Sequence, residues 1–561
     1  MPVHLHQAPV LTDGVVTLRE TRDSDTDRIV EFANDPASRE FVQSLPAPYG
    51  PDEARQFIAQ VRSNWQQPER PHTWAIETGG RWAGSIGLTA RAIGTAEVGF
   101  GAHPDVRGRG VMKRAARLIV DHAFADPGLQ VLLWRAARGN WASRRVAWSV
   151  GFTYDATLPA SRTAPDGTLT DTWHAHLLAT APRTPQHPWF VPTALSGDGI
   201  RLRAWRADDI PVDPPDPALS RYMMGSAPTP NGFQQWLTVR QERQAEGEGA
   251  FWCIADPTSD RALGGIQLFR MNSPVHAGSA MVAYWLTPDA RGRGVLRAAF
   301  DALLPHAFGN PRAGGMGLHR LAANVDADNL ASQRALWAAG FRRSGVEQQS
   351  LTYADDPPTA QLTFELLRDD DRPAQRAHAL PVPMLRTDRL VLREWRDTDR
   401  PVSDPAPDPV LAANMGVDLR PTRSGWSTWL ARHRSRALNG RSVGWCIADA
   451  STDNAIGSIV VRRIDLRLRS GTIGYTLEEP ARGHGRAGEA LKAVVDYAFS
   501  PEGLDLERLD AVTVDTNHAS MLTLASAGFR LWGQDHRSFV ALDGTICDGA
   551  YFELLRAEVA E

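Results

Sequence analysis

The stretch RGRGVMKRA, residues 107–115, returns as RGRGVLRAA at 291–299 and more loosely as RGHGRAGEA at 482–490. Each copy leads into an apolar pattern of helical period. A glycine turn before a helix exposes the first helical N–H groups, which lack intrahelical acceptors, at an end that carries about half a positive charge. With its arginines, such a turn suits a phosphate or pyrophosphate. The alternative is a tight strand-to-helix turn that needs glycine only for its positive φ.

Three further markers recur in the same order. They are L-R-x-x-R-x-x-D at 18–25, 202–209 and 392–399, then N-x-x-S from residues 140, 329 and 517, then Gly-Phe at 151, 340 and 528. The asparagine steps are 189 and 188 residues, which is too long for a solenoid unit, so each copy should be a whole domain. The predicted domains are 1–181, 193–368 and 384–561, joined by proline-rich polar linkers at 182–192 and 369–383.

The first copy alternates between strand and helix patterns. β-Branched and alternating segments predict strands, whereas capped apolar periods predict helices, so the fold class is mixed α/β in three copies. The expected strands are 15–20, 72–77, 82–91, 96–103, 131–137 and 170–178, and the expected helices are 24–34, 113–124 and 141–151.

Composition restricts the class of protein. The 561 residues are 42% hydrophobic and carry a formal net charge of −4. The chain therefore lacks the overall positive charge that would indicate direct nucleic-acid binding. The start of the chain lacks the apolar core of a signal peptide, and no apolar run approaches a membrane span, which predicts a cytoplasmic protein. Three cysteines predict buried free thiols. His4 and His6 have no further ligands clustered nearby, so no metal site is expected.

With these motifs the sequence resembles the GNAT superfamily of acyl-CoA-dependent N-acyltransferases, in the branch typified by ribosomal-protein N-terminal acetyltransferases. The superfamily signature [QR]-x-x-G-x-[GA] is matched in full by the third copy at 482–487. The first two copies match the signature at its arginine and its invariant glycine, which are Arg107 and Gly110 and then Arg291 and Gly294. At its last position they have Met112 and Leu296 in place of glycine or alanine. N-x-x-S, Gly-Phe and L-R-x-x-R-x-x-D also match this branch, and the resemblance covers nearly the whole chain.

The resemblance implies a mixed, mostly antiparallel sheet of six or seven strands with four helices, in which two central parallel strands splay apart. An acyl-CoA, such as acetyl-CoA, would place its pantetheine in that split, along the strand segment 100–103 in the first copy, and its pyrophosphate on the glycine turn. The implied cofactor-binding residues are Ala102, His103, Arg107, Gly108, Arg109, Gly110, Val111, Asn140, Leu286, Arg291, Gly292, Arg293, Gly294, Val295, Asn329, Leu477, Arg482, Gly483, His484, Gly485, Arg486, Ala487 and Asn517.

Acyl transfer needs a neutral amine, a stabilised carbonyl oxygen and a proton for the leaving thiolate. At pH 7 neutralising an α-amine costs about 1 kcal/mol and a lysine about 4 to 5 kcal/mol, so an α-amine needs only a modest base. Glu97 is the base candidate of the first copy, and Met281 and Thr472 stand at its place in the others. The candidates for protonating the thiolate are Ser143, Ser332 and Ser520.

Each of these residues also has a structural interpretation. Glu97 is equally a solvated or salt-bridged strand residue. The serines can be surface or capping residues, and the asparagines can cap their helices. His103 is expected to be a partly exposed turn residue rather than a base. By these criteria the first copy has the most complete catalytic set, the third has the best cofactor signature, and the second is supportive or specialised for another amine.

Two functions follow. One is an acetyl-CoA-dependent N-acetyltransferase, in which a primary amine of a peptide N-terminus or a small molecule attacks the thioester directly. The other is a catalytically degenerate acyl-CoA-binding scaffold or sensor. The expected partner is the amine acceptor, with no direct nucleic-acid or membrane partner. Three tethered copies can act as a pseudo-oligomer within one chain, which is compatible with a monomer.

Overall fold

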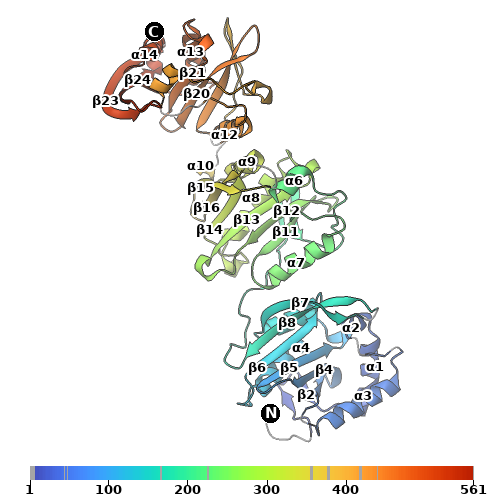
Figure 1. Cartoon of the computed structure of the whole chain (residues 1–561). Coiled ribbons are helices and arrows are strands. Elements are labelled where there is room, and N and C mark those ends of the chain that lie inside the picture. Colours follow the sequence, from blue (N-terminus) through green and yellow to red (C-terminus); the bar gives the residue numbers. More distant parts are fainter. Residues whose placement is uncertain are drawn as a thin grey trace. The chain divides into compact units, whose positions relative to one another are not determined.

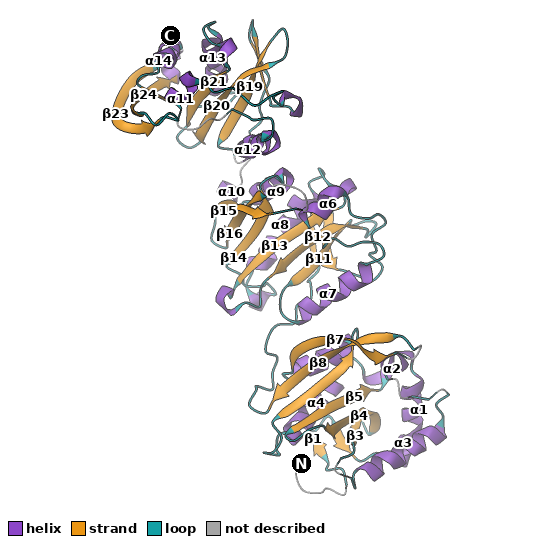
Figure 2. Cartoon of the chain, viewed as in Figure 1, coloured by secondary structure: helices purple, strands orange, loops and turns teal. Residues whose placement is uncertain are grey.

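Three eight-stranded sheets with flanking helices form the architecture of the chain (Figures 1 and 2). A computed structural model describes residues 7–42, 45–46, 48–67, 69–164, 167–223, 226–353, 358–375, 380–415, 420–438 and 440–559. All three sheets have the same strand order, which in the first is β1-β2-β3-β4-β5-β6-β8-β7. The mixed α/β class in three copies is therefore confirmed.

The strands span residues 11–178, 195–367 and 385–555. In the first sheet they are β1 Leu11–Thr12, β2 Thr17–Arg19, β3 His72–Thr78, β4 Arg81–Ala90, β5 Thr95–Ala102, β6 Val131–Ala137, β7 Thr153–Thr163 and β8 Leu169–Leu178. In the second they are β9 Leu195–Gly197, β10 Ile200–Ala204, β11 Ala250–Ala255, β12 Ala262–Phe269, β13 Ser279–Leu286, β14 Arg320–Asp326, β15 Arg342–Leu351 and β16 Thr359–Leu367. In the third they are β17 Leu385–Arg386, β18 Leu390–Arg393, β19 Ser442–Asp449, β20 Ala455–Asp465, β21 Ser470–Leu477, β22 Arg508–Val514, β23 Arg530–Val540 and β24 Ile546–Leu555.

Four of the five helices of each copy fall in corresponding places. The helices of the first copy are α1 Thr26–Asn34, α2 Pro36–Phe41, α3 Pro51–Asn64, α4 Val111–Ala123 and α5 Trp141–Ser149. Those of the second copy are α6 Pro217–Tyr222, α7 Phe233–Ala245, α8 Val295–Phe308, α9 Leu330–Ala339 and α10 Arg372–Gln375. Those of the third copy are α11 Pro409–Asn414, α12 Trp426–Leu438, α13 Arg486–Phe499, α14 His518–Ser526 and α15 Arg556–Val559. The fifth helix is α1 near the start of the first copy, and α10 and α15 after the last strands of the other two.

The strand and helix counts implied by the resemblance are too low. Each sheet has eight strands, not six or seven, and each described copy has five helices, not four. The additional strands are the short edge strand β1 and the outer strand β7, together with their counterparts. Both lie at sheet edges, where one side of the strand has no partner and the apolar alternation is weak.

The L-R-x-x-R-x-x-D motif has a structural explanation. Arg19 forms a two-pronged ion pair with Asp25 at 2.8–2.9 Å, and both side chains are about 95% buried. The Asp25 carboxylate also accepts the backbone N–H of Arg22 at 2.8 Å, which fixes the turn before α1. The same pairs form between Arg203 and Asp209 and between Arg393 and Asp399. The motif therefore joins the second strand of each sheet to the turn that follows it.

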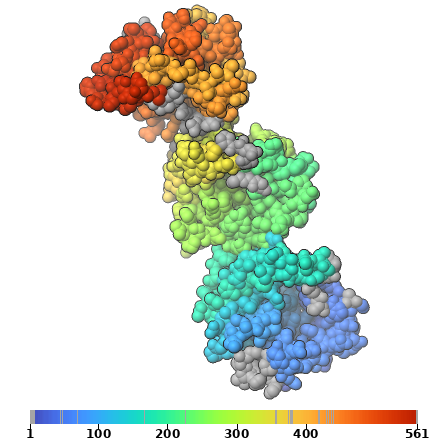
Figure 3. All heavy atoms as spheres, viewed as in Figure 1, coloured from blue at the N-terminus to red at the C-terminus, as the bar shows by residue number. Residues whose placement is uncertain are grey.

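Alternating residues on the strands fill the two faces of the first sheet. Trp74 and Ile76 belong to the core cluster that contains α4, whereas Ala75 between them belongs to the cluster formed with α1 and α3. Figure 3 shows the outer surface of the chain as space-filling atoms, coloured by residue number as in Figure 1. Cys253, Cys446 and Cys547 are free and buried, as expected.

The centre of each sheet contains its one parallel pair of adjacent strands. β5 pairs with β6 only over Thr95–Val98 and Val131–Trp134, although β5 continues to Ala102 and β6 to Ala137. The other two sheets show equally short parallel pairings, Ser279–Met281 in β13 and Ser470–Thr472 in β21. Beyond these residues the two strands are not paired, which creates the split that the resemblance implies.

The chain separates into two compact units. One contains residues 1–191 and 234–250, and the other contains 192–233 and 251–561. In the first unit, Glu242 accepts hydrogen bonds from the Arg138 guanidinium and the Trp173 indole at 2.8 Å, and Glu246 pairs with Arg144 at 2.8 Å. Across the described residues, no helix has the length and apolar character needed to cross a membrane.

Candidate functional site

The glycine turn lies where each central strand gives way to the following helix. After β5 comes one 3-10 turn, Pro104–Val106, then residues 107–110, then α4. Gly108 and Gly110 have φ of +74° and +77°, and a Cβ added at either would meet no atom within 4 Å. The turn therefore needs glycine for its backbone conformation, and the space beside it is open.

The second and third copies repeat this geometry. Gly292 and Gly294 have φ of +72° and +77°, and Gly483 and Gly485 have φ of +78° and +72°. Only Gly485 has a neighbour near its missing Cβ, the flexible side chain of Arg389 at 3.7 Å. Three cradles of one shape thus precede α4, α8 and α13.

The first N–H groups of these helices are free for a ligand. In α4 the first helical hydrogen bond runs from Arg114 N–H to Gly110 C=O at 3.2 Å, so residues 111–113 have no helical acceptor. The corresponding first bonds start at Ala298 and Glu489. The side chains of Val111 and Val295 are buried in their cores, so these residues can offer only backbone groups.

The arginines of the turn differ in role. Arg109 is exposed and its side chain has no partner in the described part of the chain, so it can reach an anion. Arg293 makes one long bond, of 3.4 Å, to the Asp289 carbonyl. In the third copy the turn is more engaged, because Arg486 pairs with Asp449 at 3.1 Å and the His484 carbonyl accepts from Arg389 at 3.0 Å.

The first arginine of each turn holds the neighbouring structure together. Arg107 donates to Asp35 at 2.7 Å and to the Ala102 carbonyl at 3.2 Å. Arg291 likewise contacts Asp216 and the Leu286 carbonyl, and Arg482 contacts Asp408 and the Leu477 carbonyl. These side chains therefore bind the end of the strand rather than point freely from the turn.

Each acidic partner of these arginines caps a short helix. Asp35, Asp216 and Asp408 accept the backbone N–H of the third residue of α2, α6 and α11 at 2.8–3.0 Å. The Arg482 guanidinium beside Asp408 lowers the pKa of that carboxyl to about 2. Sequence reasoning missed these aspartates, although an aspartate before proline in 35–36 and 216–217 is a helix-start signal.

His103 is not the partly exposed residue expected from the sequence. Its side chain is 6% exposed, and its ring nitrogens lie 2.7 Å from Asp105 and 3.0 Å from Glu31. The ring is buried because it caps the 3-10 turn that follows β5. Both nitrogens are already engaged, so the side chain is not available as a base in this arrangement.

The N-x-x-S motif forms the start of the helix after the second central strand. Asn140 caps α5 by accepting the Ser143 N–H at 3.1 Å, and Asn329 and Asn517 cap α9 and α14 in the same way at 3.1 Å. The capping interpretation of the asparagines is therefore confirmed, and their contact with a cofactor stays a prediction. The three serines are all half-buried.

Each serine hydroxyl contacts one aromatic side chain. Ser143 Oγ accepts from the Trp134 indole N–H at 3.2 Å. Ser332 Oγ lies 2.7 Å from the Tyr284 hydroxyl, and Ser520 Oγ lies 3.1 Å from the Tyr475 hydroxyl. All three aromatic residues belong to the central strands, so the structure brings each serine to the split in its sheet.

Glu97 lies in an ion-pair cluster. Its two oxygens accept from Arg91 and Arg135, each at 2.9 Å, and its side chain is 17% exposed. This is the salt-bridged interpretation of the residue. A base role requires Glu97 to release one arginine, and it stays a prediction.

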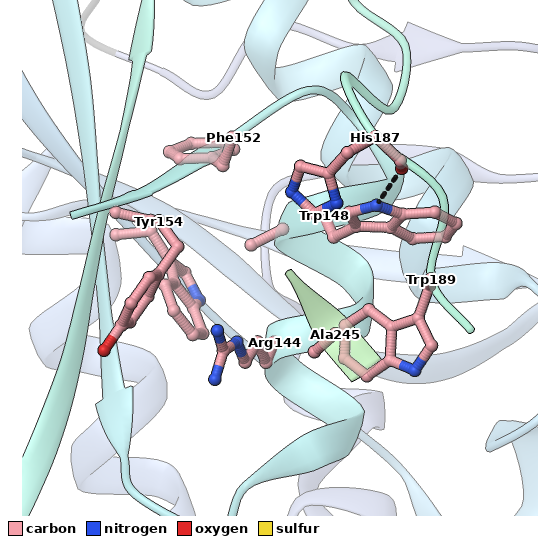
Figure 4. A pocket seen from close by; sticks show the side chains of 10 residues that line it. Arg144, Trp148, Phe152, Tyr154, His187, Trp189 and Ala245 are labelled. Carbon is pink, nitrogen blue, oxygen red and sulfur yellow. Dashed lines mark hydrogen bonds between the residues drawn. The ribbon is translucent and has the colours of Figure 1, made fainter. Parts of the chain in front are cut away.

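A pocket away from the glycine turn lies in the first compact unit (Figure 4). It holds about 300 Å³ of space, open solvent included, and Trp148 on its wall donates to the His187 carbonyl at 3.0 Å. Arg144 lies over the rings of Tyr154 and Trp173 at 4.3 and 4.6 Å. No residue of 107–110 lines this pocket, but Trp134, whose indole donates to Ser143 Oγ, does. Among described residues, no group of three His, Cys, Asp or Glu is arranged to hold a metal ion.

Comparisons with known proteins agree with the threefold pattern. The Acetyltransferase (GNAT) domain family model matches residues 16–153, 200–342 and 389–530. Uncharacterized N-acetyltransferase p20 of Bacillus licheniformis is 29% identical over 181 residues, which are 31% of this chain and 98% of that protein. Uncharacterized N-acetyltransferase YoaA of Bacillus subtilis (strain 168) is 28% identical over 180 residues, 31% of this chain and 97% of that protein.

Solved structures of acetyltransferases are also similar. One is RimL, a ribosomal L7/L12 alpha-N-protein acetyltransferase in complex with coenzyme A. It matches with a TM-score of 0.28 and 14% identity, over 30% of this chain and 98% of its own.

Proposed function

Because this chain belongs to the GNAT acetyltransferase family, whose members bind acetyl-CoA, we propose that it transfers an acetyl group from acetyl-CoA to a primary amine. The amine is the N-terminus of a protein or peptide, or an amine of a small molecule. The three matches to the Acetyltransferase (GNAT) domain family together cover three-quarters of the chain.

One observation carries the proposal. Three glycine turns have positive φ, open space at the missing Cβ, and free N–H groups on the helix that follows, and each lies beside a split in its sheet. The residues present fit a coenzyme diphosphate, because helix N-termini and backbone nests bind phosphate oxygens. In the first copy, the N–H groups of 111–113 and the Arg109 guanidinium would hold the diphosphate.

The serines fit the protonation step. When the amine nitrogen attacks, a C–N bond forms, the C–S bond breaks, and the departing sulfur needs a proton. Ser143, Ser332 or Ser520 gives the proton from Oγ, and the oxygen regains one, through water, from the nitrogen that has just become acylated. The net result is an amide and a thiol with no other reactant consumed.

The first copy carries one group that the others lack. Glu97 can accept the amine proton at one oxygen when Arg91 or Arg135 releases it. The proton of an α-amine costs only about 1 kcal/mol to remove at pH 7, so such a constrained carboxylate or a water suffices. Met281 and Thr472 leave the second and third copies dependent on water, which favours the weakly basic α-amine over lysine.

The test combines turnover and binding on the full chain. Thiol release from acetyl-CoA is measured with a peptide that has a free N-terminus, with the same peptide blocked at its N-terminus, and with a small primary amine. Calorimetry with CoA gives the number of occupied domains. Turnover that S143A/S332A/S520A abolishes while CoA binding persists supports the proposal.

The outcome that overturns it is specific. Binding of CoA without thiol release on any amine would favour the acyl-CoA-binding scaffold or sensor, an alternative suggested by the absence of a Glu97 counterpart in two copies. Absence of CoA binding to all three domains would contradict both functions.

A further inference from the structure

The three serines share a feature that their motif does not explain. Each one has an aromatic N–H or O–H group within 3.2 Å of Oγ, but the group comes from different strands. It is the Trp134 indole on β6 in the first copy, the Tyr284 phenol on β13 in the second, and the Tyr475 phenol on β21 in the third. The two phenols also contact the backbone carbonyl of the same serine, Tyr284 at 3.2 Å and Tyr475 at 3.4 Å.

The sheet register shows which positions correspond. Phe100, Tyr284 and Tyr475 each lie opposite an isoleucine of the preceding strand, at Ile86, Ile266 and Ile459. The first copy therefore has phenylalanine, which carries no hydroxyl, at the place where the others have the tyrosine.

The loss of the phenol is matched on the neighbouring strand. Trp134 lies opposite Ala175 on β8, and the corresponding positions on β14 and β22 hold Ala323 and Ala511. At these two positions the first copy thus has phenylalanine and tryptophan, whereas the other two copies have tyrosine and alanine. The facing residues on β8, β16 and β24 are Ala175, Phe364 and Phe552, so one large aromatic ring is kept in this strand pair in every copy. The exchange also keeps a polar aromatic group beside the serine oxygen.

We propose that Trp134, Tyr284 and Tyr475 are positioning residues, each of which donates a hydrogen bond to the serine oxygen so that the serine hydrogen is directed to the departing sulfur. This inference rests on the proposed function and extends it to a residue outside the N-x-x-S motif. The indole N–H is only a donor, so in the first copy Ser143 Oγ must accept, and its own hydrogen is left for another group.

The donor also assists the transfer itself. A hydroxyl that accepts a hydrogen bond becomes a better donor, and the oxygen is stabilised as it gives up its proton. The Trp134 side chain is 2% exposed, whereas Ser143 is half-buried. Burial raises the pKa of both Tyr284 and Tyr475, so these phenols keep their protons through the neutral range and remain donors.

The test isolates one domain at a time in the full chain. The S332A/S520A background keeps only the serine of the first copy, and the S143A/S332A background keeps only the serine of the third copy. With acetyl-CoA and the fastest amine of the panel, W134F in the first background and Y475F in the third should each lower kcat about tenfold or more, with KM for acetyl-CoA within about twofold. Y475F removes a single oxygen, so it keeps the core filled if W134F misfolds.

Rescue separates positioning from structure. F100Y added to W134F rebuilds the donor of the other copies and should restore most of the lost kcat. Matched controls are W82F, which removes a buried indole N–H with no partner in the described residues, and Y497F, which removes the phenol of a ring that packs edge-on against Trp445. Both should leave kcat within about twofold.

The outcomes distinguish this inference from the proposed function. If S143A keeps full turnover in the S332A/S520A background, the serine role itself fails. If S143A abolishes turnover but W134F and Y475F do not lower it, only the positioning role is overturned. A crystal structure of the full chain with CoA tests the inference without any amine substrate. The serine oxygen should contact both the ring donor and the sulfur. A ring donor turned away from Oγ would overturn the inference.

Discussion

The ion pair between Arg482 and Asp408 should stabilise the segment beside the third glycine turn measurably. Asp408→Asn keeps an oxygen that can cap α11, because asparagine is as good an N-cap as aspartate, but it removes the charge that Arg482 binds. Arg482 is the largest cause that lowers the Asp408 pKa from 3.8 to about 2, and the Leu411 N–H adds to it, so the ion pair contributes at most about 2 kcal/mol at neutral pH. The Asp408 side chain is 4% exposed, so solvent screens this pair little.

The pH dependence follows from the direction of the shift. The carboxyl pKa is lower in the folded chain, so its stabilisation is complete above the unfolded value of 3.8 and is lost as the pH falls toward about 2. Between pH 5 and 7 the difference between the parent protein and D408N should therefore be constant.

Hydrogen exchange of the α11 amides at residues 410–414 is the direct assay. If the segment opens locally, D408N should exchange faster than the parent at pH 6–7 by up to about thirtyfold, since about 2 kcal/mol is about one and a half decades. Asp397→Asn is the matched control, because Asp397 is 83% exposed and its pair with Arg434 should contribute a few tenths of a kcal/mol. Equal exchange in D408N and the parent, or an equal change in D397N, would refute the reasoning.

Three further outcomes are expected. Gly110→Ala places a Cβ at φ +77°, which costs about 1 kcal/mol or more, and should weaken CoA binding by the first domain in calorimetry, whereas Gly14→Ala, at φ +87° outside the turn, should leave that affinity unchanged. Asn329→Ala removes the α9 cap and should lower the free energy of unfolding in urea by about 1 kcal/mol, so an unchanged midpoint would count against the cap. Burial raises the pKa of the Cys446 thiol to about 12, so a thiol reagent at pH 8 should label it only as fast as the domain opens, and rapid labelling of the native chain would contradict that burial.

Local patterns in the sequence predicted much of the fold because they reflect local physics. The residues 82–91 alternate as a strand should, and β4 runs over Arg81–Ala90. The apolar stripe after residue 110 predicted a helix that the structure places at Val111–Ala123. N-x-x-S indicated a cap, and all three asparagines form one.

The missed strand β7 shows where local patterns fail. Thr153–Thr163 contains Pro159, and its pairing with β8 is interrupted between Leu158 and Arg162, where Ala160 takes a φ of +48°. The same interruption occurs at Gln349 and Arg537 in the other two copies. A bulge breaks the two-residue alternation, so only pairing with the neighbouring strand reveals such a segment as part of the sheet.

The sequence by itself determined the threefold repeat, the mixed α/β class and the positions of the glycine turns, because periodicity, capping and positive φ depend on residues close together in the chain. Tertiary structure alone decided which groups meet. It placed Asp35 against Arg107 and both Arg91 and Arg135 against Glu97. It also placed an aromatic hydrogen-bond partner beside each serine, a tryptophan in the first copy and a tyrosine in the other two. Partners separated by tens of residues are chosen by strand order and register, which no local pattern encodes.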